Sequence, residues 1–151
     1  MKKIVNLCAG ILAVIAVLSF AGCSARNPIT ADDFKQKAEA AGFKVTDSTT
    51  NNPDVDKYLS AVKSETGTEI FFISFKTDAA ASAMYTNIKA SISEGTSGTA
   101  KNLDSSSYNK YTLVNGEIHH SLSRMASTIV YGKTTSTYQK QVDDFFNSIK
   151  Y

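Results

Sequence analysis

Two adjacent histidines, His119 and His120, are the side chains best suited to acid–base or metal chemistry, and the sequence has no other histidine. The segment around them alternates as a strand does, so their imidazoles point to opposite faces and do not chelate one metal ion together. A zinc site would need carboxylates from elsewhere, and none is placed there by spacing. We expect no metal and no cofactor, one exposed histidine, and one histidine against a helix.

Arg124 shares a strand face with His120 if the strand is regular. Its planar guanidinium favours bidentate contacts, so it is suited to bind a carboxylate or phosphate of a ligand. It is equally suited to pair with an acid of the chain such as Asp143 or Asp144, which is the more ordinary role.

Tyrosines on the predicted strands are further candidates to line a groove, namely Tyr58, Tyr108, Tyr111 and Tyr131. Strand tyrosines usually lie at the edge of a core, with the ring inside and the hydroxyl outside. From this set we select Tyr111 and Tyr131, together with His120 and Arg124, as candidate contacts to a ligand or partner.

Patterns that would indicate catalysis are missing from the sequence. No serine lies in a nucleophile elbow, and no glycine-rich phosphate loop occurs. Asp54 and Asp56 lie two residues apart, but the other oxygen ligands and the glycine of a calcium loop are missing. We therefore expect a protein that is not an enzyme.

Three helices are predicted to position these residues. The first begins after the N-cap Thr30 and ends at Gly42, and the second follows Thr77. The third begins near Ser136, which would form a capping box with Gln139. Its buried stripe is predicted to consist of Tyr138, Val142, Phe145, Phe146 and Ile149.

Strands are predicted between the helices from alternation and from β-branched or aromatic residues. Residues 43–46 form one, and residues 69–75 are so apolar that we place them inside a sheet covered on both faces. Residues 108–131 are typical of a meander. Its turns are predicted at Asn115-Gly116, as a type I′ hairpin, and at Ala126-Ser127.

Two segments leave alternatives open. Residues 55–64 fit a strand, which we prefer, or a helix that starts at Asn52-Pro53. Residues 93–107 are rich in Ser, Gly and Thr, as in an Ω-like loop or a partly disordered connection. Leu103 would dock this segment or begin a short edge strand.

The predicted order of elements is αβββα(β)βββα, so a helix followed by about three strands occurs twice before a closing helix. Strands joined by tight turns pair antiparallel. We therefore predict one α+β domain over residues 29–151, a single twisted antiparallel sheet with helices packed on it.

The first 23 residues have the order of an export signal: Lys2 and Lys3, an apolar stretch, two small residues and a cysteine. The segment Phe20-Ala21-Gly22-Cys23 resembles the lipobox of bacterial lipoproteins, although Leu is the commonest residue where Phe20 stands. The apolar stretch alone would also suit an uncleaved anchor or an ordinary secretory signal.

The lipobox resemblance implies that a signal peptide, residues 1–22, is cut between Gly22 and Cys23. Cys23 would then carry lipid and, with a short tether over residues 23–28, hold the domain at the extracytoplasmic face of the cell membrane. A single acyl chain binds a membrane only marginally, so stable anchoring needs more than one.

Without residues 1–22 the chain has 129 residues, with 14 basic and 14 acidic side chains. No block of like charges occurs, so we expect no nucleic acid as a partner. Cys8 would leave with the signal and Cys23 would carry lipid, so we also expect no disulfide.

The segments Thr30–Phe34 and Ser123–Thr128, with the Ile-Phe-Phe strand between them, resemble small uncharacterised lipoproteins of Gram-positive bacteria. This resemblance implies a location and a fold but no activity. We therefore expect a lipid-anchored, non-enzymatic module that binds a cell-envelope protein or peptide. The alternatives are a small-molecule binder or weak hydrolase that uses His120 and Arg124, or a structural accessory.

Overall fold

A computed structural model describes residues 27–95 and 97–151, in which seven strands and three α-helices form one α+β domain. The helices are α1 (Ala31–Ala40), α2 (Asp78–Ser93) and α3 (Gln139–Ser148), and a 3-10 turn, η2 (Ser136–Tyr138), precedes α3. The strands are β1 (Lys44–Asp47), β2 (Val55–Lys63), β3 (Thr68–Phe75), β4 (Thr99–Asp104), β5 (Tyr108–Asn115), β6 (Ile118–Met125) and β7 (Thr128–Thr135).

All seven strands of the described chain lie in one antiparallel sheet, in the order β1-β2-β3-β7-β6-β5-β4. The predicted fold class and order of elements are therefore confirmed. Two local meanders, β1-β2-β3 and β4-β5-β6-β7, meet where β3 pairs with β7. The apolar strand β3 lies inside the sheet, as expected from its sequence.

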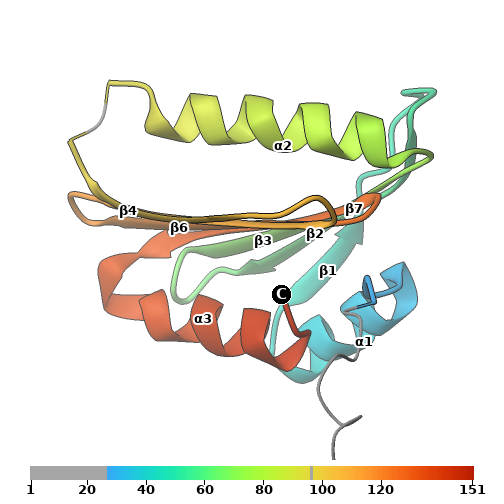
Figure 1. The fold of residues 1–151 in the computed structure, drawn as a ribbon. Coiled ribbons are helices and arrows are strands. Elements are labelled where there is room, and N and C mark those ends of the chain that lie inside the picture. The colour runs from blue at the N-terminus through green and yellow to red at the C-terminus, as the bar shows by residue number, and fades with distance from the viewer. Residues whose placement is uncertain (1–26, 96) are drawn as a thin grey trace, which may run out of the picture.

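The sheet is covered unequally on its two faces. Helices α1 and α3 pack on one face, and α2 packs alone on the other (Figure 1). The core between the sheet and α1 and α3 is centred on Phe34, Phe72, Val130, Val142 and Phe146. The smaller core under α2 consists of Phe75, Ala81, Tyr85, Tyr111, Leu113, Leu122 and Ile129. No helix in the described part of the chain has the length and hydropathy needed to span a membrane.

Local sequence determines both ends of α1. The Thr30 hydroxyl accepts a hydrogen bond from the Asp33 backbone N–H at 3.1 Å, as an N-cap does. Gly42 has φ +82°, and its N–H donates to Glu39, while that of Phe43 donates to Ala38. This is the Schellman pattern, and it confirms the predicted start and stop of the helix.

The first ambiguous segment is a strand, and the second contains the short edge strand that was one of its alternatives, over Thr99–Asp104. Residues 55–63 form β2, paired on one side with β1 and on the other with β3, so the preferred alternative is confirmed. Part of the Ser/Gly/Thr-rich segment forms the edge strand β4, so a loop throughout residues 93–107 is wrong. Leu103 lies on β4 with 56% of its surface exposed and does not dock the segment.

The hairpin between β5 and β6 lies where it was predicted, but its turn is displaced by one residue. Asn115 pairs with Ile118, so Gly116 and Glu117 are the central residues. Only Gly116 has a positive φ, +58°, as in a type II′ turn, so the predicted type I′ turn is wrong. Ala126 and Ser127 form the predicted turn between β6 and β7, with Ala126 at φ +47°.

The start of the last helix also differs from the prediction. Ser136 begins the 3-10 turn η2 rather than α3, and neither η2 nor α3 has a side-chain cap, so the capping box is wrong. Tyr138 ends η2 with 39% of its surface exposed, because the 3-10 turn rotates it off the buried stripe. The other four predicted stripe residues of this helix are buried.

Helix α3 packs directly over Gly132 of β7. A Cβ atom at this position would lie 2.7 Å from Val142 Cγ1 and 3.0 Å from Phe146 Cε2. Ser121, its partner on β6, is also small and fully buried. These two small residues therefore allow α3 to pack against the middle of the sheet.

We predict that Gly132→Ala lowers the free energy of unfolding by about 1–3 kcal/mol, because the added methyl overpacks the contact with α3. Urea denaturation measures the loss. Ser121→Ala is the control, because it removes a buried hydroxyl that has no hydrogen-bond partner in the described structure and should be neutral or stabilising. Equal stability of Gly132→Ala and the unmodified protein would contradict this packing.

Candidate functional site

The candidate residues His120 and Arg124 lie on the same face of β6, the face that α2 covers, as predicted. Leu122 lies between them and belongs to the core under α2. The two residues are four positions apart along the strand, a distance of about 13 Å. The structure therefore places them in different surroundings, and each must be considered separately.

His120 belongs to a row of four partly buried rings that crosses β2, β3, β7 and β6 on the α2 face. Tyr58 and Phe71 have ring centroids 6.1 Å apart, Phe71 and Tyr131 are 6.0 Å apart, and Tyr131 and His120 are 6.1 Å apart. The last two pairs are stacked, with interplanar angles of 15° and 8°. We call these four residues the aromatic row.

A hydrogen bond holds the end of the aromatic row. His120 Nδ1 and the Tyr131 hydroxyl are 2.8 Å apart. Burial lowers the pKa of His120, and the charges of Lys133 and His119 lower it further. Burial also raises the pKa of Tyr131 to about 12, with a further contribution from Glu69. Both rings are therefore uncharged at neutral pH, and the row is an aromatic rather than an ionic surface.

His119 points to the opposite face and is 1% exposed beneath α3, so the expectation of one histidine against a helix is confirmed. The expectation that the other histidine is exposed is wrong, because His120 is partly buried in the aromatic row. Its Nε2 lies 3.3 Å from Asp143 Oδ1 but without the geometry of a hydrogen bond. Burial lowers the pKa of His119 more than Asp143 raises it, so the ring is neutral at neutral pH. Residues 27–95 and 97–151 hold no group of three or more metal-ligating side chains.

Arg124 is 4% exposed and bonds only neutral acceptors among the described residues. Its Nε donates to Asn109 Oδ1 at 2.6 Å, Nη1 to the Ala126 carbonyl at 3.1 Å, and Nη2 to the Ser106 carbonyl at 2.9 Å. The predicted pairing with Asp143 or Asp144 is wrong. Those acids lie on α3, beyond the other face of the sheet, where Asp144 pairs with Lys140 at 2.6 Å.

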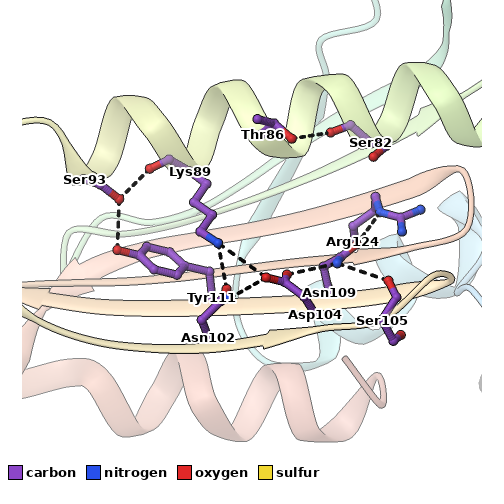
Figure 2. Close-up of polar contacts among 10 residues, drawn as sticks. All are labelled: Ser82, Thr86, Lys89, Ser93, Asn102, Asp104, Ser105, Asn109, Tyr111 and Arg124. Atoms are coloured by element: carbon purple, nitrogen blue, oxygen red, sulfur yellow. Dashed lines mark hydrogen bonds and ion pairs between the residues drawn. The ribbon is translucent and has the colours of Figure 1, made fainter.

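Asn109 connects Arg124 to a polar cluster at the edge of the sheet (Figure 2). Its amide donates to Asp104 Oδ1 at 3.0 Å, and Lys89 of α2 lies 3.7 Å from Asp104 Oδ2. Lys89 also donates to Asn102 Oδ1 at 2.8 Å. The hydrogen bond from Asn102, followed by those from Asn109 and Lys89, lowers the pKa of Asp104. The cluster therefore holds two cations and one carboxylate at neutral pH.

A groove of about 500 Å³ runs between α2 and the β4–β5 edge above this cluster. Its lining residues are Ser82, Tyr85, Thr86, Lys89, Ala90, Ser93, Asp104 and Asn109. Tyr111 lies at its end, where its hydroxyl is 2.9 Å from the Ser93 hydroxyl and Lys89 lies over its ring. We call this the α2 groove.

The structure thus divides the four candidate contacts into two pairs. His120 and Tyr131 meet in the aromatic row, and Arg124 and Tyr111 lie beside the α2 groove. Sequence reasoning missed three residues of these sites. It assigned Phe71 of the aromatic row to the core, and it did not select Tyr85 and Lys89 of the α2 groove as candidate contacts. The spacing of Tyr85 and Lys89, one helical turn apart, was the available signal. Cys23 and Gly22 lie outside the described residues.

No protein-family model matches the sequence, and no curated protein matches it. Among solved structures, a GTP binding regulator from Thermotoga maritima is similar, with 14% sequence identity and a TM-score of 0.49. The match covers 82% of this chain and 89% of that one. A similarity at this level says nothing about what the present chain binds.

We predict that Arg124→Lys lowers the free energy of unfolding by about 1–3 kcal/mol. Lysine keeps the positive charge but cannot reach the Asn109 side chain and two separate carbonyls at once, so a buried acceptor loses its donor. Chemical denaturation measures the effect. A change below about 0.5 kcal/mol, the range of ordinary surface substitutions, would show that charge alone matters at this position.

Proposed function

We propose that this protein is a lipoprotein anchored at the extracytoplasmic face of the cell membrane through Cys23, and that it binds a partner rather than catalysing a reaction. The lipobox-like segment at residues 20–23 supports the location. The observation that carries the binding function is the aromatic row, a partly exposed surface on the part of the sheet beside α2.

The aromatic row suits a protein or peptide of the cell envelope. Aromatic rings are enriched where proteins meet, because they provide large contact areas with few rotatable bonds. Stacking and the hydrogen bond between His120 and Tyr131 already hold these rings in place, so little conformational entropy remains to be lost on binding. Glu69 and Lys133 form a cross-strand pair on the same face. They place one negative and one positive side chain at the border of the row.

The position of the tether favours the same surface. Ile29 packs against the core between the sheet and α1 and α3, and its N–H lies 3.3 Å from the Tyr151 hydroxyl. The chain thus enters the domain on the face opposite α2 (Figure 1). Six residues from Cys23 to Ile29 span at most about 20 Å. The domain would stay close to the membrane with its α2 face, and the aromatic row, directed outward.

The alternative of a weak hydrolase is less well supported. His120 and Arg124 lie about 13 Å apart along one strand. The Nδ1 atom of His120 is held by Tyr131, and Arg124 holds two backbone carbonyls and Asn109. A general base and an electrostatic stabiliser must both reach one reacting group. These two residues do not.

We predict that Cys23→Ala moves the protein from the membrane fraction to the soluble fraction, or leaves it unprocessed. The substitution removes the sulfur to which the lipid would be attached. Fractionation and intact-mass measurement of the two proteins test this. If the unmodified protein shows neither added lipid mass nor a difference in fractionation from Cys23→Ala, the proposed anchoring is wrong.

We predict that an envelope partner can be cross-linked to the lipidated protein in bacterial membranes and that Tyr58→Ser abolishes this cross-link. The substitution deletes one end of the aromatic row. Tyr138→Ser is the matched control, since it removes an exposed tyrosine elsewhere on the domain. The measurement is recovery of the same cross-linked species with the three proteins, each checked for unchanged thermal unfolding. Equal recovery with Tyr58→Ser and with the control would contradict a role for the row.

A further inference from the structure

One residue that lines the α2 groove carries a buried hydrogen-bond donor that has no partner among the described residues. Tyr85 lines the groove and is 5% exposed, and its hydroxyl has no hydrogen-bond partner among the described residues. An unpaired buried hydroxyl destabilises the folded state, because it has lost its hydrogen bonds to water. Burial, with the nearby charge of Asp104, raises the pKa of Tyr85 well above its usual value. The phenol therefore keeps its proton at neutral pH and can donate a hydrogen bond.

Arg124 adds positive charge behind the same groove. Of the five N–H donors of a guanidinium, three bond Asn109, Ala126 and Ser106, so two remain. No carboxylate of the described chain lies within ion-pair distance of Arg124. A buried guanidinium that is bonded only to neutral acceptors keeps its full charge toward its surroundings.

The charge balance of the groove is positive. Among the lining residues Lys89 is the cation and Asp104 is the carboxylate, and Arg124 adds a second cation behind the lining, bonded to Asn109. Asp104 is already engaged by Lys89 and by the amides of Asn102 and Asn109. Its negative charge is therefore largely compensated inside the cluster. Arg124 forms no ion pair with an acid of the described residues, and Asn109 lies between it and Asp104.

We propose that the α2 groove binds a small molecule through an oxyanion group, a phosphate or carboxylate. The Tyr85 hydroxyl donates a hydrogen bond to the oxyanion, Lys89 contributes an ammonium at the rim, and Arg124 supplies the charge beneath. Charge-assisted hydrogen bonds of this kind are shorter and stronger than those between neutral groups. A bound oxyanion would satisfy the buried phenol and balance the guanidinium.

This site is separate from the aromatic row and from the lipid on Cys23. Its lining comes from α2, β4 and β5, whereas the row lies on β2, β3, β7 and β6. A ligand in the groove would also bridge α2 to the β4–β5 edge. Binding should therefore stabilise the fold by mass action.

The test measures thermal unfolding and calorimetric binding of the full chain in detergent, with inorganic phosphate, acetate and glycerol 3-phosphate as probes. At least one probe should raise the melting temperature in a concentration-dependent manner. Stronger binding of glycerol 3-phosphate than of phosphate indicates a lipid headgroup or polyol phosphate. Equal binding of the two indicates a free anion, and preference for acetate indicates a carboxylate ligand.

Tyr85→Phe isolates the hydroxyl, because it keeps the ring and removes only the unpartnered donor. We expect it to weaken probe binding about tenfold while the unliganded protein stays at least as stable. Lys89→Gln should weaken binding as well. Tyr138→Phe is the matched control, which removes a phenol hydroxyl outside the groove and should leave binding unchanged. No shift with any probe, or equal affinities of Tyr85→Phe and Tyr138→Phe, would overturn the proposal.

Discussion

The antiparallel pairing of β3 with β7 is the contact that makes this chain one domain. Each meander is built from local hairpins. Phe72 of β3 and Val130 of β7, however, are paired although they lie more than fifty residues apart in the sequence. Both strands contribute side chains to the cores on both faces of the sheet. Neither meander could bury these residues alone, so hydrophobic burial stabilises the long-range pairing despite its entropic cost.

Unequal coverage of the two faces follows from this arrangement and creates the candidate surfaces. Seven strands are too wide for one helix, because a helix has a diameter of about 10 Å and neighbouring strands are about 4.8 Å apart. Helices α1 and α3 share one face, whereas α2 alone packs over the middle of the other. The aromatic row and the α2 groove both lie on that second face, beside α2.

Sequence patterns predicted what depends on neighbouring residues. The cap at Thr30, the stop at Gly42 and the apolar strand β3 each follow from a few adjacent side chains, and all three are confirmed. The order of strands and the coverage of the faces depend on contacts between distant segments. Sequence reasoning therefore assigned Phe71 to the core, although its ring lies in the partly exposed row.

One displaced turn explains why the site around Arg124 was not predicted. A two-residue turn at Asn115-Gly116 would place Arg124 opposite Ser107, whereas the observed turn at Gly116-Glu117 pairs Arg124 with Asn109. A shift of two residues keeps every side chain on its face but exchanges its cross-strand neighbour. The observed register gives Arg124 the amide of Asn109 rather than the hydroxyl of Ser107 as its neighbour. A carboxylate at position 109 would neutralise the guanidinium, whereas the neutral amide of Asn109 leaves Arg124 its positive charge.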